Sequence, residues 1–301
     1  RAGVRAMADP YPRLSVIRPA MAGPERWSRS HGALGGTAVW ERLVALPTAV
    51  VGCGRGGSLA AGALARLGLR DLTLIDPDTI EPHNLGEMAI VHDADVGRAK
   101  AEALAWRLRD QLQGWPARYR AVTAPVRQPA ALAALRRCRV VVCWADRDAA
   151  RLAVGLVAAL YHQVLLDVGV GIEAGPGGDR RMGADIRLVV PGDGCLLCRG
   201  NLRDYPEALR RLGEPRAEPA ASWPEQRAGS LHSLNQIAVG LGLRLLEDLV
   251  AERVGGSTWA RLEFDAAGRL TVSYPPFGSP EGGCALCARA GMGDAGLAWR
   301  T

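Results

Sequence analysis

The feature that most constrains this fold is a glycine-rich turn between a short β-branched run and a longer apolar run. Residues 48–54, TAVVGCG, are typical of a buried parallel strand that ends in glycines. The run that follows, SLAAGALARLG, has the composition of a helix and stops at Gly68. A strand, a tight turn and a helix in that order begin a βαβ unit, so the chain is predicted to build a parallel sheet.

The alternation of strands and helices continues along the chain. Further strands are expected at 71–77, 118–123, 139–146, 163–171 and 184–190, and helices at 96–112, 148–162 and 231–250. Two more runs, 257–265 and 269–274, form a predicted antiparallel pair around an Ala-Ala-Gly turn. The predicted fold class is therefore α/β, a Rossmann-like, doubly wound and mostly parallel sheet with a C-terminal antiparallel extension.

The predicted domain division separates an N-terminal extension from one large domain. Residues 1–45 are rich in Pro, Gly and Arg and are expected to be irregular, with one helix. Residues 46–301 form the domain, with a nucleotide-binding half at 46–195 and a partner-binding half at 196–301. Within the second half, 201–230 hold several prolines and many charges with little pattern, which is typical of a functional or disordered loop.

Composition excludes several classes of protein. Of the 301 residues, 48% are hydrophobic and no apolar run reaches the roughly 20 residues that span a bilayer. The N-terminal residues show no secretory signal, so we expect a soluble, cytoplasmic protein without a membrane role. The net charge of +6 comes from scattered arginines, not from a cluster, which argues against nucleic acid and favours an anionic ligand.

The glycine turn has the spacing of a phosphate-binding loop. Gly52, Gly54 and Gly57 read G-x-G-x-x-G at a strand end that opens a helix, where free N–H groups and the helix dipole attract phosphate. Asp76 follows 19 residues after Gly57, at the end of the next strand, where an acidic residue binds ribose hydroxyls. These residues predict a nucleotide site but do not separate ATP from NAD.

The segment after the second strand carries more polar residues than an NAD site needs. Asp78 and Asn84 lie in it, and Lys100 follows as the only lysine in a chain with 36 arginines. Asp146 ends the strand at 139–146. Because ligands of open α/β sheets bind outside the carboxyl ends of the strands, we expect Asp76, Lys100 and Asp146 to converge there, with Lys100 as a compact phosphate-binding ammonium.

The cysteines divide into two groups. Four of the seven form C-x-x-C pairs, and we expect them to build one tetrahedral, structural zinc site from Cys195, Cys198, Cys284 and Cys287. Cys138 and Cys143 bracket a buried strand and are predicted to be inert core residues, whereas Cys53 lies inside the glycine loop.

The motifs in order resemble those of the ThiF/MoeB/HesA family, the bacterial relatives of ubiquitin-activating enzymes. The chain shows VGCGRGGS, DPDTIEPHNLGEM, DVGRAKA, ADRDAAR, CLLC and CALC between about residues 46 and 288. The resemblance implies ATP- and magnesium-dependent adenylation of the C-terminal carboxylate of a small ubiquitin-like or sulfur-carrier protein or peptide. It also implies a homodimer and a residue-by-residue site: glycines 52, 54 and 57 at the phosphates, Asp76 at the ribose, Asp78 beside the nucleotide, Asn84 and Lys100 at the phosphates and Asp146 at magnesium.

Two departures from the family pattern qualify this expectation. The family's N-L-x-R-Q reads Asn84-Leu85-Gly86-Glu87-Met88, so a glutamate replaces an arginine near the triphosphate. Arg55 stands in the glycine loop where the family has glycine. We expect Arg55 to supply the missing positive charge, tethered by Glu87. The competing interpretation is a site that no longer turns over.

A further departure concerns the step after adenylation. Family members that form a thioester or persulfide carry a cysteine in the region of 201–230, but this chain has none between Cys198 and Cys284. We therefore expect adenylation without a covalent cysteine step. Two alternatives remain open: adenylation of a small-molecule or ribosomal-peptide carboxylate in a biosynthetic cluster, and a catalytically silent binding subunit. An NAD oxidoreductase is the least favoured interpretation, because no residue in the sequence looks like the acid that accompanies hydride transfer.

Overall fold

The computed structural model describes residues 24–174, 180–200, 231–276 and 283–297. The predicted loop at 201–230 lies outside them. The strands are β1 (Thr48–Val51), β2 (Asp71–Ile75), β3 (Arg118–Val122), β4 (Val140–Cys143), β5 (Val164–Ala174), β6 (Arg180–Val189), β7 (Thr258–Phe264) and β8 (Leu270–Ser273). The α-helices are α1 (Ser28–Leu34), α2 (Thr37–Val44), α3 (Arg55–Leu67), α4 (Lys100–Gln111), α5 (Pro129–Leu135), α6 (Asp148–Leu160), α7 (Leu196–Gly200) and α10 (His232–Val250). The 3-10 helices are η1 (Pro24–Trp27), η2 (Pro82–Asn84), η3 (Asp93–Asp95), η5 (Cys287–Arg289) and η6 (Gly293–Leu297).

The eight described strands form one mixed sheet in the order β3-β2-β1-β4-β5-β6-β7-β8. The first five are parallel to one another, and β6, β7 and β8 continue the sheet as antiparallel neighbours. This confirms the predicted doubly wound sheet with an antiparallel C-terminal extension. The strand order reverses between β1 and β4, which places the classical ligand crevice at the carboxyl ends of those two strands.

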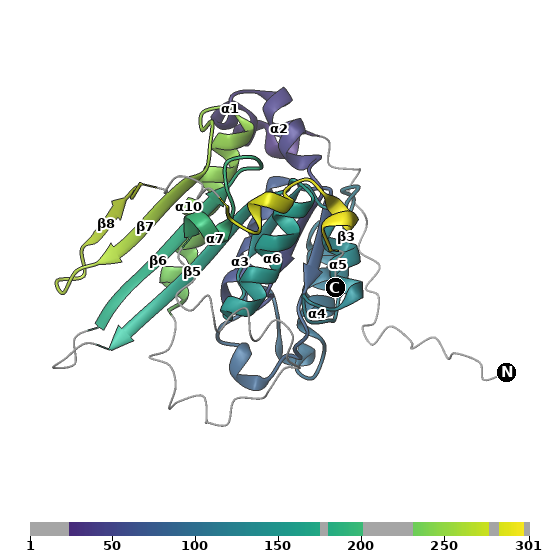
Figure 1. The fold of residues 1–301 in the computed structure, drawn as a ribbon. Helices are drawn as coiled ribbons and strands as arrows, with labels where there is room; N and C mark the ends of the chain where they lie inside the picture. The colour runs from purple at the N-terminus through teal and green to yellow at the C-terminus, as the bar shows by residue number, and fades with distance from the viewer. Residues whose placement is uncertain (1–23, 175–179, 201–230, 277–282, 298–301) are drawn as a thin grey trace.

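Helices cover both faces of the parallel part, because successive side chains of a strand point to opposite faces. Val50 packs with α3, α4 and α10 in one core, whereas Ala49 and Val51 pack with α5 and α6 in the other. Figure 1 shows α6 and α10 on opposite faces of the sheet. Both faces of β1 and β4 are therefore apolar, and polar chemistry is confined to the strand ends.

The N-terminal segment is more ordered than the sequence predicts. Instead of an irregular extension with one helix, residues 28–44 hold two helices, α1 and α2. Trp27 and Trp40 are buried in the same core as α3, and Trp115 joins them, with ring centroids 4.3 Å from Trp27 and 6.0 Å from Trp40. The division of the chain at residue 46 stays a prediction.

These aromatic residues cap the end of α3, the helix that begins in the glycine loop. The indole N–H groups of Trp27, Trp40 and Trp115 donate to the carbonyls of residues 66, 67 and 68 at 2.6, 2.9 and 2.9 Å. The Tyr119 hydroxyl donates to the carbonyl of residue 69 at 3.1 Å. The last carbonyls of a helix have no partner within the helix, so these side chains satisfy them and fix α3 from its far end.

Truncating one of these caps should destabilise the whole fold. Trp40 is 1% exposed, and we expect Trp40→Ala to lower the free energy of unfolding by about 3–5 kcal/mol through the cavity that it leaves. Urea denaturation measures this loss. Arg42→Ala, on the same helix with a half-exposed side chain, is the matched control and should change stability by less than about 1 kcal/mol. Equal effects of the two variants would contradict the capping role.

Candidate functional site

The glycine loop closes tightly at the switch point of the sheet. Gly52 has a φ of +86°, in the left-handed region that favours glycine, and its N–H donates to the carbonyl of Ile75 at 2.9 Å. A Cβ at Gly57 would lie 1.7 Å from the Gly52 carbonyl oxygen, so helix and loop touch backbone to backbone. Gly54 is the N-cap of α3, and a Cβ there would meet nothing within 4 Å. Open space thus lies beside the free N–H groups that begin α3.

The contact at Gly57 gives a direct test of this geometry. We expect Gly57→Ala to cost at least about 2 kcal/mol of stability or to displace the loop, because its methyl group has no space. Gly240→Ala is the matched helical control, since a Cβ at Gly240 in α10 meets nothing within 4 Å. That variant should stabilise the chain by up to about 1 kcal/mol. Thermal unfolding of both variants checks the prediction, and a neutral Gly57→Ala would refute it.

Asp76 joins the glycine loop to the segment that follows β2. Its carboxylate accepts the backbone N–H of Cys53 at 2.6 Å and the backbone N–H of Asp78 at 2.8 Å. The residue is 6% exposed, and this burial raises its pKa, although both N–H bonds and the nearby charge of Lys100 act in the opposite direction. Asp76 therefore lies where the sequence predicts it, and its contact with ribose stays a prediction.

Lys100 begins α4 and faces the same region. Its Nζ lies 3.3 Å from Asp78 Oδ2, and its backbone N–H donates to the Asp78 carbonyl at 2.9 Å. The side chain is 13% exposed, so it does not project into solvent as a surface lysine does. Its charge also acts on Asp76 and on the Cys53 thiol, whose pKa burial raises well above the ordinary value. The single lysine of the chain thus lies beside the glycine loop, paired with one of the predicted site residues.

Asn84 is buried at the end of η2, and its side chain stabilises the turn that this helix forms. Its Oδ1 accepts the backbone N–H of Glu81 at 3.0 Å, and the Glu81 side chain caps the same turn. Among the described residues, no acceptor is assigned to its Nδ2 group. One half of the amide therefore holds the turn, and the other half keeps the donors that a phosphate contact requires.

Arg55 and Glu87 form an ion pair across the site, as the sequence analysis expects. Arg55 is the first residue of α3, and Glu87 comes from the loop that follows η2. Whether Arg55 takes part in chemistry stays a prediction.

Asp146 lies exposed in the loop between β4 and α6, at the carboxyl end of its strand. Its convergence with Lys100 and a role toward magnesium stay predictions. Five residues later, Arg151 binds Asp167 of β5, with Nε 2.9 Å from Oδ1 and Nη2 in contact with Oδ2. Burial lowers the pKa of Arg151, but the adjacent Asp167 carboxylate more than compensates and raises it.

Asp167 is a residue that the sequence analysis missed. It is fully buried in β5 and also lies 3.4 Å from Arg187 on β6, which in turn lies 3.2 Å from Asp185. An acidic residue inside the apolar run VLLDVGV was the available signal, because a carboxylate is buried only with partners. This network links α6, the helix that follows β4, to the antiparallel extension.

The four paired cysteines meet, although 85 residues separate the two pairs. The Sγ atom of Cys195 lies 3.6 Å from the Sγ atoms of both Cys198 and Cys284. The Sγ atom of Cys198 lies 3.5 Å from that of Cys287. Disulfide sulfurs would lie about 2.05 Å apart, whereas four thiolates around zinc at about 2.3 Å lie about 3.8 Å apart. The cluster therefore fits a tetrahedral metal site, and zinc is the ion we expect.

The core cysteines behave as predicted. Cys138 and Cys143 are 5% and 0% exposed, and burial raises their pKa to about 11 and about 12. Both thiols are therefore protonated and unreactive at neutral pH.

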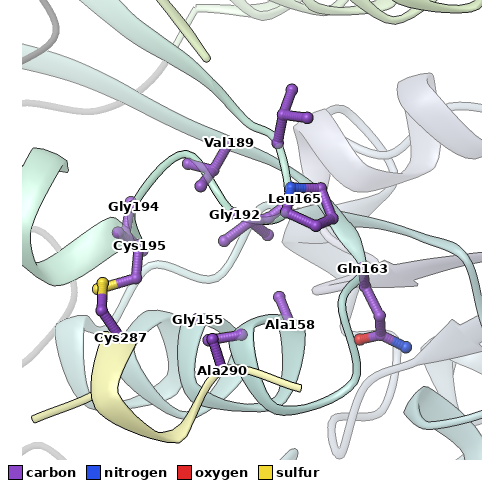
Figure 2. Close-up of a pocket in the computed structure, with 14 residues that line it drawn as sticks. Gly155, Ala158, Gln163, Leu165, Val189, Gly192, Gly194, Cys195, Cys287 and Ala290 are labelled. Atoms are coloured by element: carbon purple, nitrogen blue, oxygen red, sulfur yellow. The ribbon is translucent and has the colours of Figure 1, made fainter. Parts of the chain in front are cut away.

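A small cavity beside the cysteine cluster does not qualify as a substrate pocket. Figure 2 shows Cys195 and Cys287 meeting at one end of it and Gln163 at the other, with α6 along one side. Its volume is about 20 Å³, which holds no more than one water. The carboxyl ends of β1, β2 and β4 stay the predicted place of substrate chemistry.

Comparison with known proteins agrees with this geometry. The family model described as the ThiF family matches residues 28–221, more than half of the chain. Among solved structures, E. coli MccB with ATP is 20% identical, with 89% of this chain and 76% of that chain covered and a TM-score of 0.63. The microcin C7 biosynthetic enzyme MccB with N-formylated MccA is 18% identical, with 87% of this chain and 74% of that chain covered and a TM-score of 0.64. PaaA is 16% identical, with 88% of this chain and 77% of that chain covered and a TM-score of 0.58. No curated protein matches the sequence.

The fold, the glycine loop and the clustered thiols together define a ThiF-type adenylyltransferase. The chain belongs to the ThiF family. In the part of the chain that the structure describes, no helix is both long enough and apolar enough to cross a bilayer.

Proposed function

We propose that this protein uses ATP to adenylate the C-terminal carboxylate of a peptide in a biosynthetic reaction. The observation that carries the proposal is the placement of Lys100 beside a glycine loop whose helix N-terminus faces open space. A loop of this kind binds phosphates, and the compact ammonium of a lysine neutralises a developing charge.

The reaction exchanges one bond at phosphorus for another. A carboxylate oxygen of the peptide attacks the α-phosphorus of ATP, a new O–P bond forms, and the bond to the bridging oxygen of the β-phosphate breaks. Pyrophosphate leaves with both bonding electrons, and the product is a mixed anhydride of the peptide and AMP. Lys100 and the N–H groups at the start of α3 would bind the phosphate oxygens, and Asp76 the ribose. Asp146 would hold magnesium, which neutralises phosphate charge when bound.

The comparisons favour a peptide over a larger carrier protein. One of the similar solved structures is E. coli MccB with MccA-N7isoASN, and another is MccB with N-formylated MccA. An isoasparagine residue and an N-formyl group are both features of an amino-acid chain. A small ubiquitin-like or sulfur-carrier protein stays the second candidate, because its C-terminal glycine presents the same carboxylate to the same site.

The absence of a cysteine between Cys198 and Cys284 bears on the next step. The mixed anhydride would be passed to a nucleophile other than a thiol of this segment.

A homodimer, as the sequence analysis expects, stays a prediction that analytical ultracentrifugation can check.

ATP–pyrophosphate exchange with purified protein tests the proposal. Candidate peptides with a free C-terminal carboxylate should support exchange, and the same peptides with an amidated C-terminus should not. Exchange with a Gly-Gly-ended carrier protein alone would favour the second candidate. ATP binding with no exchange for any carboxylate would favour the silent binding subunit.

A further inference from the structure

The Arg55–Glu87 pair carries an inference about how the proposed ATP site is assembled. Arg55 Nη2 contacts Glu87 Oε1, and the two side chains are 12% and 24% exposed. A pair this shielded is not the loose surface contact that exposed arginines and glutamates form. Each side chain therefore interacts mainly with the other and with whatever binds beside them.

A second set of contacts fixes Glu87 relative to Arg55. The backbone N–H of Ala89, two residues after Glu87, donates to Ser58 Oγ at 2.8 Å. The Ser58 hydroxyl donates in turn to the Arg55 carbonyl at 3.0 Å. The loop that carries Glu87 is thus fastened to the first turn of α3, so the carboxylate approaches the guanidinium from one defined side.

The guanidinium is left with donors that the chain does not use. Among the described residues, neither Nε nor Nη1 of Arg55 has a hydrogen-bond partner, and both atoms are shielded from solvent. Buried donors without acceptors are rare in folded proteins, and each one needs an explanation such as a bound water, an ion or a functional role. A Cβ at Gly54 or at Gly86, the residues that precede Arg55 and Glu87, would meet nothing within 4 Å, so the backbone beside the pair has space for a ligand.

We infer that Glu87 is a positioning residue: it holds Arg55 by Nη2 so that Nε and Nη1 bind the phosphate chain of the nucleotide. This inference rests on the proposed function. A guanidinium has five N–H donors in a rigid plane and can bridge a carboxylate and a phosphate, which a lysine cannot do in the same way. Glu87 and Arg55 both depart from the family pattern, and Glu87 acts through Arg55.

This role predicts that the effect of removing the Glu87 charge changes sign with the background. With Arg55 present, Glu87→Gln releases the guanidinium and weakens ATP binding. With Arg55 absent, Glu87 is an unpaired carboxylate beside the phosphates and repels them. Glu87→Gln then strengthens ATP binding.

Isothermal titration calorimetry on four proteins tests the inference, with ATP and adenosine as the probes. We expect Glu87→Gln to weaken ATP binding about fivefold alone and to strengthen it about threefold in the Arg55→Ala background, since coupled residues are not additive. Adenosine binding, which involves no phosphate, should not change. Arg55→Gln replaces Arg55→Ala if the alanine variant does not fold. The exposed pair Arg42–Glu252 is the matched control, and Glu252→Gln should have no effect in either background.

Each outcome separates the inference from the proposed function. The sign change, with unaltered adenosine binding, supports the positioning role. ATP binding by the wild type with equal effects of Glu87→Gln in both backgrounds overturns the positioning role and leaves the proposed function standing. A wild-type protein that binds adenosine no worse than ATP overturns both.

Discussion

Lys100→Ala is expected to lower the rate of ATP–pyrophosphate exchange about 100- to 1,000-fold, as the loss of one preorganised charge at a reacting phosphate does. Lys100 lies 3.3 Å from Asp78 and acts electrostatically on Asp76 and Cys53, so the variant loses one of the positive charges beside the glycine loop. Lys100→Arg should recover only part of the rate, because a planar guanidinium does not occupy the place of a compact ammonium.

Two controls make this prediction sharp. Thermal unfolding should show that Lys100→Ala still unfolds in one cooperative transition, so that a loss of exchange is not caused by a loss of the fold. Arg42→Ala removes an exposed charge far from the site and should leave exchange unchanged. A Lys100→Ala protein that retains exchange within about threefold of the wild type would show that Lys100 is a structural residue and not a phosphate-binding one.

Loss of the metal is expected to destabilise the C-terminal part of the chain. Leu286 and Cys195 share a small core with Leu152 of α6, and the N–H of Gly291 donates to the carbonyl of Ala159 at 3.0 Å. Arg136 and Tyr161 also bond Asp294 in the tail. A metal bound by the four cysteines would add further links between the tail at 283–297 and residues 195–198. We expect Cys195→Ser or strong chelation to lower the melting temperature by at least about 10 °C, because structural zinc contributes folding free energy directly.

Metal analysis by mass spectrometry tests this second prediction. One zinc ion per chain is expected in the wild type and in Cys138→Ser, whose cysteine is buried away from the cluster. Cys195→Ser should contain none. A metal-free wild-type protein with unaltered melting temperature would mean that the four sulfurs meet for packing alone.

The sequence predicts the parts of this molecule that short motifs encode. G-x-G-x-x-G at a strand end fixes the loop because Gly57 touches the Gly52 carbonyl, a contact that admits no side chain. The apolar runs of β1 and β4 are predicted for a similar reason, since strands covered on both faces contain little else. In these cases the local pattern and the tertiary environment demand the same residues.

The rest depends on pairs that are far apart in the chain. Helix α5 escapes prediction because PAALAAL is short, and the caps of α3 come from Trp27, Trp40 and Trp115, which no spacing rule connects. The Arg151–Asp167 pair likewise joins α6 to β5. Such contacts exist only once the sheet has brought the elements together, so the residues alone indicate that partners are needed without naming them.

The central claim is that a carboxylate attacks the α-phosphorus of ATP, and oxygen transfer tests it most directly. A peptide labelled with ¹⁸O in its C-terminal carboxylate is incubated with the protein, ATP and magnesium, and the AMP formed is analysed by mass spectrometry. The account predicts AMP that carries one ¹⁸O atom, because the attacking oxygen stays on phosphorus when the acyl group moves on. AMP or ADP without label, formed at the same rate with and without the peptide, would contradict it.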